Sequence, residues 1–585
     1  MQSNEKRSRG WLWRGSLRQG LLALMGAFFF FSAHSPALLL SAEPARLAPA
    51  DSASSADREY FDIVKSIDLF SEVYSEVSKG YVDTLNVSGL MYAGIDGMLR
   101  TLDPYTVFLD ENDADELDEL TSGHYAGIGI TIASVDTLFY VTSVVDGYAA
   151  AKAGLRIGDT IVAINGREIR TMSLDEVKTL IKGPAGSPIT FLIERQGVPS
   201  FSSTLMREEV RVSTVSYSGI LDGTGYIEMK SFGSHSMDDL REAIQGLLRQ
   251  ASEQHFQLKG LILDLRNNPG GLLNVAVDVA SLFVSKGSEV VSIRGRSPEM
   301  AKSYVTASPP LLPALPLVVL INSQSASAAE IVAGAIQDLD RGVIIGERSY
   351  GKGLVQSVIR ISYNSSLKLT TSKYYTPSGR LIQKEVNNAV RESRKVIPVP
   401  QGETATQIFY TKGKRKVYGG GGILPDIQLP EPVTSPYLSE LNKRGLIFLF
   451  SSAYRSLNPV MPVQPLDRAA VMVSFADFLQ RRKFVYTSDS ERRFNELRES
   501  MKKVQSTNTE SDSQSVTAFQ QEIDRLKKQE ITAESEHVAQ ALEVEILRHF
   551  NDRIARTVEI GHDTAVKKAV WLFSDSRGYS RILHP

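Results

Sequence analysis

Two serines and one lysine, Ser325, Ser327 and Lys352, have the residue types and the setting that nucleophilic catalysis needs. They lie in residues 316–356, which read PLVVLINSQSASAAEIVAGAIQDLDRGVIIGERSYGKGLVQ. Both serines stand among small residues, between an apolar run typical of a strand and apolar residues at helical spacing. Lys352 stands between two glycines, after a second predicted strand. The sequence therefore places a serine-rich strand-to-helix turn one strand before a lysine.

A serine hydroxyl on the first turn of a helix lies beside backbone N–H groups that have no partner within the helix. Such donors suit the negative oxygen that forms when a hydroxyl attacks a carbonyl. The serine also needs a proton acceptor, and a lysine can serve when burial lowers its pKa from about 10.4. Glycines on both sides of Lys352 leave the backbone free to turn the amine inward. The alternative is that the serines cap the helix and that the lysine turn is solvated.

This segment resembles the catalytic region of the C-terminal processing peptidases, also called tail-specific proteases. The shared pattern is S-A-S-A-x-E followed by G-E-x-[TS]-[FY]-G-K-G-x-x-Q, with Ser349 where the family has threonine. The resemblance implies that Ser327 is the nucleophile, that Lys352 is the general base and that Gln356 orients the lysine. It implies neither a metal nor a cofactor.

A second signature lies upstream, where an apolar run at 261–265 is followed by R-N-N-P-G-G. This run resembles the D-L-R-x-N-P-G-G motif of the same family. Backbone N–H groups after such a turn can complete an oxyanion hole with the N–H of Ala328. Gly271 is the expected donor and Gly270 the alternative, although a tight turn at positive φ also explains both glycines. Glu330, near the helix start, is expected to be structural.

Residues 123–210 change to short strands with one clear helix. Three motifs follow in order, Y-A-G-I-G-I, A-G-L-R-I-G-D and I-N-G, and a capping box of Ser173 and Glu176 begins the helix. The motifs resemble those of a PDZ domain, which adds a peptide strand to a sheet edge and holds the terminal carboxylate with backbone N–H groups. A plain β-rich packing module is the alternative. The residues expected to hold a peptide tail are Gly127, Ile128, Gly129 and Ile130.

The N-terminus has the pattern of a signal peptide, with five basic residues, an apolar stretch at 21–31 and small residues that suit cleavage. An uncleaved membrane anchor is the alternative, because 21–40 is about the length that spans a bilayer. A histidine, a serine and a proline at 34–36 interrupt this stretch, which favours cleavage. In both cases the bulk of the chain is expected to be exported, either periplasmic or otherwise extracytoplasmic.

The sequence predicts a multidomain α+β protein of 585 residues. The L-D-P-Y turn at 102–105 is expected to belong to a packing segment. Apolar stripes on the charged C-terminal helices indicate core or homo-oligomer packing. The expected parts are a signal peptide or anchor at 1–42, a linker at 43–57, a helical N-terminal region at 58–121, a PDZ domain at 122–210, an α/β protease core with βαβ units at 211–430 and a helical C-terminal extension at 431–585.

Composition excludes several classes of function. The formal net charge of −2 argues against a nucleic-acid partner, and the absence of cysteine excludes thiolate chemistry and disulfides. We therefore expect a serine endopeptidase that cleaves exported proteins with free C-terminal tails. Two alternatives are a non-enzymatic PDZ scaffold and a Ser-His-Asp hydrolase that uses His235 or His255, although no G-x-S-x-G elbow surrounds Ser327.

Overall fold

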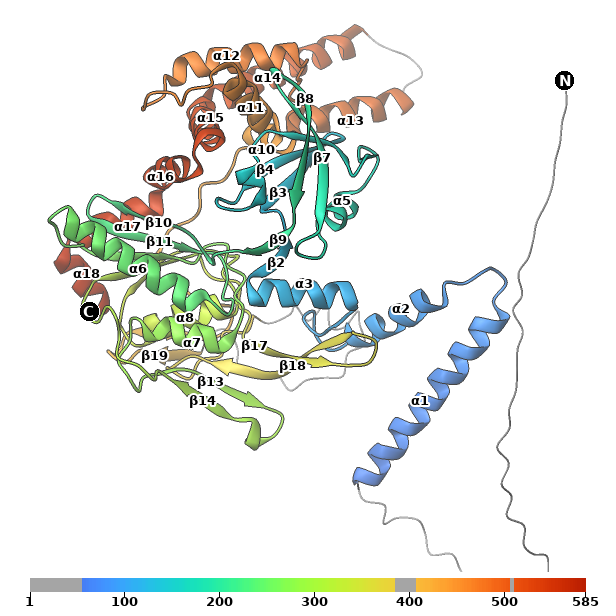
Figure 1. The fold of residues 1–585 in the computed structure, drawn as a ribbon, viewed down its shortest axis with the longest axis vertical. Coiled ribbons are helices and arrows are strands. Elements are labelled where there is room, and N and C mark those ends of the chain that lie inside the picture. Colours follow the sequence, from blue (N-terminus) through green and yellow to red (C-terminus); the bar gives the residue numbers. More distant parts are fainter. Residues whose placement is uncertain (1–54, 385–406, 505–509, 585) are drawn as a thin grey trace, which may run out of the picture. The chain divides into compact units, whose positions relative to one another are not determined.

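The structure, a computed structural model, describes residues 55–384, 407–504 and 510–584 (Figure 1). The predicted signal peptide or anchor at 1–42 lies outside the described residues, as does most of the predicted linker. The chain divides into two compact units, residues 1–87 and residues 88–585. Within the described ranges, no helix combines the length and the hydropathy that crossing a membrane requires.

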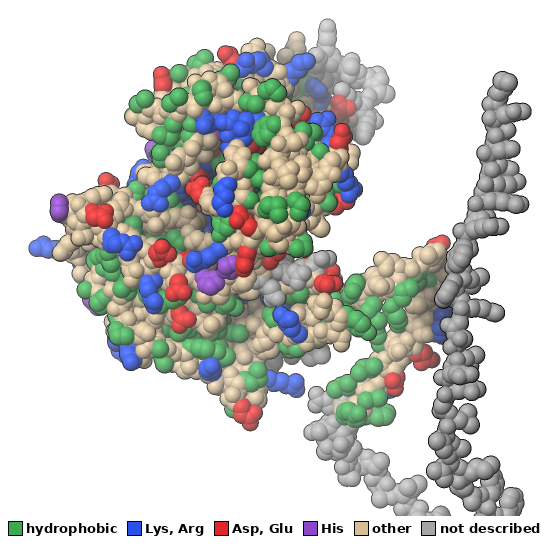
Figure 2. Space-filling model, viewed as in Figure 1, with side chains coloured by type: hydrophobic (Ala, Val, Ile, Leu, Met, Phe, Trp, Pro, Cys, Tyr) green, Lys and Arg blue, Asp and Glu red, His purple; other side chains and the backbone are tan. Residues whose placement is uncertain are grey.

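In the first unit, one long helix, α1 (Ser55–Gly80), keeps its apolar side chains exposed. Figure 2 shows these hydrophobic side chains along the helix. The hydroxyl of Tyr74 donates to the carbonyl of Val87 at 2.9 Å, which closes the turn after the helix. The exposed apolar residues of α1 include Tyr60, Phe61, Ile63, Ile67, Phe70 and Val73.

The second unit opens with two helices and a short strand between them. These are α2 (Val87–Leu99), β1 (Val107–Leu109) and α3 (Glu111–Ser122). A side-chain oxygen of Asp110 accepts from the N–H of Asp113 to cap α3, and Gly123 at φ 74° ends the helix. β1 pairs antiparallel with β18 (Ser366–Tyr375), so this segment is joined by a strand to the region that contains Lys352.

The PDZ-like domain is a six-stranded antiparallel sheet with two short helices. β2 (His124–Gly127) enters the domain and β9 (Glu208–Arg211) leaves it, and the two pair antiparallel. The predicted capping box is confirmed, since the N–H of Glu176 donates to Ser173 Oγ and the N–H of Ser173 to Glu176 Oε2. The other elements are β3 (Ile130–Val135), β4 (Leu138–Val144), α4 (Ala149–Lys152), β5 (Thr160–Ile164), β6 (Arg167–Glu168), α5 (Leu174–Ile181), β7 (Pro188–Arg195) and β8 (Val198–Met206).

The protease core is built on a six-stranded central sheet, which confirms the predicted βαβ units. Its strands follow the order β10-β11-β12-β15-β16-β21, and all neighbours are parallel except β10 and β11. The strands are β10 (Val215–Leu221), β11 (Thr224–Met229), β12 (Leu261–Asp264), β15 (Leu317–Ile321), β16 (Val343–Gly346) and β21 (Ile427–Gln428), and the helices between them are α6 (Ser236–Glu253), α7 (Leu273–Ser281) and α8 (Ala328–Asp338).

A second sheet of the core contains β1 and β18. β17 pairs with most of the length of β18. On β18, β1 pairs with the first residues and β13 pairs with the last. The elements not yet named are β13 (Glu289–Gly295), η1 (Pro298–Met300), β14 (Lys302–Val305), β17 (Leu354–Arg360), and the paired strands β19 (Ile408–Tyr410) and β20 (Lys416–Tyr418).

The two faces of the central sheet are covered by different parts of the chain. Leu261 and Leu263 of β12 pack in one cluster with α6, α7 and α8, whereas Ile262 between them packs with the last helices of the chain. This alternation follows the two-residue period of a strand. A strand buried on both faces reads as a continuous apolar run, which is the pattern at 261–265.

The C-terminal region is helical, as predicted. Its first helices form a cluster of their own, and α11 touches the PDZ-like domain, where the rings of Tyr140 and Phe448 meet edge to face at 5.7 Å. The helices are α10 (Pro436–Lys443), α11 (Leu446–Leu457), α12 (Arg468–Arg481), α13 (Asp489–Val504), α14 (Glu510–Ala533), α15 (Ser535–Phe550), α16 (Asp552–His562), α17 (Thr564–Ser574) and α18 (Ser576–Leu583).

Candidate functional site

Ser327 is the residue from which α8 begins, directly after the turn that follows β15. Its backbone has φ 54° and ψ −115°, a conformation that non-glycine residues adopt rarely and mostly at functional sites. Its side chain is partly exposed, whereas Ala326 and Ala328 on either side are buried. Ser325 is fully buried, and its hydroxyl donates to the carbonyl of Leu265 at 2.8 Å. Of these two serines, Ser327 alone has solvent access.

Glu330, one turn into α8, holds the backbone of Ser327 and the backbone of Lys352 together. Its Oε2 accepts from the N–H of Ser327 at 2.8 Å and from the N–H of Lys352 at 2.9 Å. Its Oε1 accepts from the hydroxyl of Ser349 at 2.5 Å and from the N–H of Gly351 at 2.7 Å. The pKa of Glu330 is raised to about 7, because the effect of complete burial outweighs these four hydrogen bonds, which lower it.

Tyr374 of β18 joins the same two residues from the other side of the backbone. Its hydroxyl lies 3.2 Å from the carbonyl oxygen of Ser327 and 2.5 Å from that of Lys352. The ring is 1% exposed. Two buried side chains, from a helix and from a strand of the other sheet, therefore fix the serine turn next to the lysine turn.

The amine of Lys352 lies in a partly buried setting with charges of both signs around it. The pKa of Lys352 is lowered to about 8, chiefly by burial and then by the like charge of Lys368, while the carboxylates of Glu330 and Asp103 oppose the shift. The amine lies 4.8 Å from the ring centre of Tyr105. It forms no ion pair with a residue in the described part of the chain. A fraction of this lysine is therefore neutral near pH 7.

Gln356 lies on β17, at the point where the pairing of β17 with β18 shifts register. Its amide donates to Thr370 Oγ1 on β18 at 3.3 Å. Among the hydrogen bonds of the described residues, Gln356 has none to Lys352. The structure thus places the glutamine on the strand that follows Lys352 and pairs it with a threonine.

The glycine turn after β12 lies against the start of α8. Gly270 has φ 98°, and a side-chain carbon there would stand 2.8 Å from both the Cβ of Ser327 and the nitrogen of Ala328. The N–H of Gly270 donates to Asn268 Oδ1 at 2.9 Å. Within the described residues, no hydrogen bond uses the N–H of Gly271 or that of Ala328. Two backbone donors, one directly after Ser327 and one directly after Gly270, are thus without a hydrogen-bond partner among the described residues.

The PDZ-like loop has one glycine at positive φ and one buried apolar side chain. Gly129 has φ 79°, in the left-handed region that favours glycine. A side-chain carbon at Gly127 would stand 2.6 Å from the Tyr125 ring, so this ring lies across the loop. Ile128 is 1% exposed within the domain core, and Ile130 packs against that core.

The histidines of the alternative triad have other surroundings. His235 precedes α6, and its Nε2 lies 3.3 Å from that of His124 on β2. His255 is exposed, just after the end of α6. Within the described part of the chain, neither His235 nor His255 is hydrogen-bonded to Ser327.

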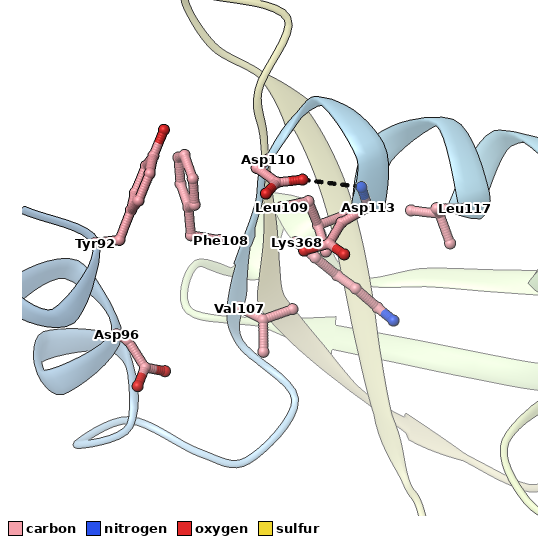
Figure 3. Close-up of a pocket in the computed structure, with 9 residues that line it drawn as sticks. All are labelled: Tyr92, Asp96, Val107, Phe108, Leu109, Asp110, Asp113, Leu117 and Lys368. Atoms are coloured by element: carbon pink, nitrogen blue, oxygen red, sulfur yellow. Dashed lines mark hydrogen bonds between the residues drawn. The ribbon is translucent and has the colours of Figure 1, made fainter. Parts of the chain in front are cut away.

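A cavity of about 610 Å³ lies beside Lys368, and none of the predicted site residues lines it. Figure 3 shows it between α2, β1, α3 and β18, with the facing rings of Tyr92 and Phe108 at one end. Lys368, whose charge also acts on Lys352, lines it. Its other lining residues are Asp96, Val107, Leu109, Asp110, Asp113 and Leu117.

Three residues of this site, Glu330, Tyr374 and Tyr105, were not identified as site residues from the sequence. Glu330 is the last residue of the S-A-S-A-x-E motif and Tyr105 the last residue of L-D-P-Y, so both belong to motifs that the family resemblance used. Neither motif states what the side chain touches. Tyr374 lies in a strand whose composition gives no sign of its partners.

Comparison with known families identifies three parts of the chain. The model of peptidase family S41 matches residues 223–391, which include the serine and lysine turns. A PDZ domain model matches residues 140–195. The model of a probable PDZ-protease, C-terminal helical domain, matches residues 437–573.

Relatives that the chain matches are named carboxy-terminal processing proteases. The protein of this name from Bartonella bacilliformis is 37% identical over 366 residues, which are 61% of this chain and 83% of the relative. The carboxy-terminal processing protease CtpA of Bacillus subtilis is 32% identical over 336 residues, 57% of this chain and 69% of the relative. Among solved structures, the photosystem II D1 C-terminal processing protease is 28% identical, with a TM-score of 0.33, over 65% of this chain and 96% of its own. The chain therefore belongs to the carboxy-terminal processing proteases, the serine peptidases of family S41.

Proposed function

We propose that this protein is an endopeptidase in which Ser327 is the nucleophile and Lys352 the general base. The observation that carries the proposal is the carboxylate of Glu330, whose single oxygen Oε2 accepts from the backbone N–H groups of both residues. A shared acceptor keeps the serine turn and the lysine turn adjacent. The lowered pKa of Lys352, to about 8, supports its role, because only a neutral amine can accept a proton.

In this mechanism the neutral amine of Lys352 takes the proton of the Ser327 hydroxyl as the oxygen attacks the scissile carbonyl. The lysine then returns the proton to the leaving amine, and an acyl-enzyme remains on Ser327. A water molecule, deprotonated by the same lysine, hydrolyses this ester and frees the serine. Gln356 is proposed to act on the lysine through the β17–β18 pair, since its amide bonds Thr370 rather than Lys352.

The oxyanion of the tetrahedral intermediate is proposed to bind the N–H groups of Gly271 and Ala328. Ala328 follows Ser327 directly and Gly271 follows Gly270, which lies against Ser327, and neither N–H is used in a hydrogen bond within the described residues. The N–H of Gly270 is already paired with Asn268, which favours Gly271 over Gly270. Preorganised donors of this kind contribute about 10²–10³ each to kcat in serine proteases.

The substrates are proposed to be exported proteins with free C-terminal tails, held by the PDZ-like domain through Gly127, Ile128, Gly129 and Ile130. The match of the PDZ model and the left-handed turn at Gly129 support this role. We also propose that the protein is exported, with association at the membrane if its N-terminal segment is retained.

The test is cleavage of an unstructured peptide with a free C-terminus, followed by mass spectrometry. Ser327→Ala and Lys352→Arg are each expected to lower kcat by at least about 10³, since one removes the nucleophile and the other cannot lose its proton. Wild-type kcat/KM should rise as pH rises through about 8, because the neutral fraction of Lys352 grows there. Ser323→Ala, on the exposed part of the same turn, is the matched control and should be fully active. Normal turnover by Ser327→Ala, or a rate that is flat from pH 6 to 10, would contradict the mechanism.

A further inference from the structure

Tyr105 is the side chain whose contact with the amine of Lys352 the structure defines most directly. The ring centre lies 4.8 Å from Nζ, within the range of a cation–π contact. Tyr105 comes from the turn between α2 and β1, far from Lys352 in sequence. A segment expected only to pack thus delivers an aromatic ring to the proposed base.

The turn that carries Tyr105 is fixed by its own aspartate. Asp103 Oδ1 accepts from the N–H groups of Tyr105 and Thr106 at 2.7 and 2.8 Å, and Oδ2 accepts from the Thr106 hydroxyl at 3.0 Å. Such side-chain-to-backbone bonds hold a turn in one conformation. The carboxylate of Asp103 also acts on the charge of Lys352.

The same turn is anchored to β18, the strand that borders the base. Thr106 is 2% exposed, and its hydroxyl accepts from the N–H of Thr370 at 3.2 Å. Val107, the next residue, pairs with Lys368 in the β1–β18 register. The turn is therefore held against the part of β18 that carries Lys368 and the threonine partner of Gln356.

The far end of the Tyr105 ring lies near the lysine's own turn. Tyr350, two positions before Lys352, is close enough for its hydroxyl to act on that of Tyr105. Burial is the largest cause that raises the pKa of Tyr105 well above its usual value, so the phenol stays neutral. The backbone of Tyr105 is thus fixed by its turn, with the amine of Lys352 beside the ring.

We propose that Tyr105 is a positioning residue for the base, and that its ring covers the amine of Lys352 and keeps bulk water from it. This inference rests on the proposed role of Lys352. The other charged groups that act on the amine are Lys368 on β18, Glu330 on α8 and Asp103 in the turn. A cover that excludes water disfavours the ammonium, whereas the face of an aromatic ring attracts it. Because burial is the largest influence on Lys352, exclusion of water is the dominant effect.

The experiment compares the pH dependence of kcat/KM for Tyr105→Phe, Tyr105→Leu and Tyr105→Ala with that of wild type. Tyr105→Ala opens the cover, so the midpoint of the rise of kcat/KM with pH should move up by about one pH unit. The variant should therefore be about tenfold less active than wild type at pH 7 and should recover activity at high pH. Tyr105→Phe keeps the ring, and Tyr105→Leu keeps apolar bulk without the aromatic face, so neither midpoint should rise. The proposal would be overturned if Tyr105→Ala lowered kcat/KM equally at every pH without moving the midpoint. It would also be overturned if the midpoint rose as much in Tyr105→Phe as in Tyr105→Ala.

A second measurement does not depend on catalysis. In Ser327→Ala protein, the acylation of Lys352 by an amine-reactive ester can be followed by mass spectrometry across pH. Adding Tyr105→Ala should move the midpoint of labelling upward, whereas adding Tyr92→Ala, a ring at the neighbouring cavity, should not. An unmoved midpoint with Tyr105→Ala overturns the cover. If a folded Lys352→Met protein were active, the proposed function would be wrong. The labelling of Lys352 in the Ser327→Ala protein would still test the role of Tyr105.

Discussion

At the scale of single residues, Glu330 determines the geometry of the site more than either reacting side chain does. A buried carboxylate is costly unless hydrogen bonds compensate for lost water, and here both oxygens accept two bonds each. All four donors come from the serine turn or the lysine turn. The residue is structural, as the sequence indicated, but the structure that it stabilises is the alignment of the proposed dyad.

Glu330→Gln tests this role because an amide has one acceptor atom where the carboxylate has two. Its NH₂ group would face at least one backbone N–H, and an unpaired buried donor costs about 1–3 kcal/mol. We expect the free energy of unfolding to fall by about that amount and kcat to fall at least tenfold. Chemical denaturation and peptide cleavage measure the two effects. Glu299→Gln, on the exposed turn η1, is the control, and equal behaviour of the two variants would contradict the role of Glu330.

Much of the residue-level candidate site could be predicted from the sequence, because the proposed reacting groups are letters of a motif. Ser327, Lys352 and the glycine turn were found this way and the structure brings them together. Tyr105 and Tyr374 were not, because their roles depend on partners from other elements. The bond between Thr106 and Thr370, for example, joins positions 264 residues apart. Local periodicity carries no information about such pairs.

At the scale of elements, the helices and buried strands of the core follow from the sequence, whereas β1 does not. β1 has three residues, and its pairing with β18 is what makes it a strand. So short a run has no periodicity to detect. The PDZ-like domain, in contrast, could be predicted from the sequence, because its three motifs lie at turns and loops that the fold requires.

The PDZ-like loop gives a prediction that combines substrate and enzyme. Amidating the C-terminus of a peptide should lower kcat/KM about tenfold or more, because the loop N–H groups would then lose their charged partner. Gly129→Asp should remove the preference for the free acid by placing a like charge at the loop. Steady-state cleavage of the two peptides by each protein is the measurement.

The control for this substitution is Gly129→Ala. Any side chain at φ 79° is strained, and a Cβ there would stand 2.8 Å from the Cβ of Tyr148, so both variants share this cost. Only the aspartate adds repulsion of a carboxylate. If free and amidated peptides are cleaved equally by wild type, the domain packs but does not select tails.

At the scale of the whole chain, the last helices belong physically to the protease core. Helices α16, α17 and α18 cover the face of the central sheet that α6, α7 and α8 leave open. The hydroxyl of Tyr579 bonds both the N–H and the carbonyl of Leu317, the first residue of β15, at 3.0 Å. β15 leads directly to the serine turn. Arg266, beside the glycine turn, pairs with Asp563 at the start of α17 at 2.8 Å.

The sequence identified this region as helical with apolar stripes but left core and oligomer packing open. An apolar stripe shows that a helix has a partner and does not show which one. The partner here is the central sheet, whose buried strands are apolar on both faces. Only the folded structure shows that the last helices pack against it.

Phe573 and Trp571 of α17 provide the test at this scale, because they lie on opposite sides of one helix. Phe573 is 9% exposed and packs against Gly260 before β12, whereas Trp571 is 53% exposed. Phe573→Ala should lower the free energy of unfolding of the core by about 3–5 kcal/mol, and Trp571→Ala should change it by less than about 0.5–1 kcal/mol. Hydrogen exchange should show faster opening of β12 and β15 in the first variant, and cleavage activity should be lost at a lower temperature. If the faster exchange were confined to α17, with β15 and activity unchanged, the C-terminal helices would be an appendage and not one wall of the protease core.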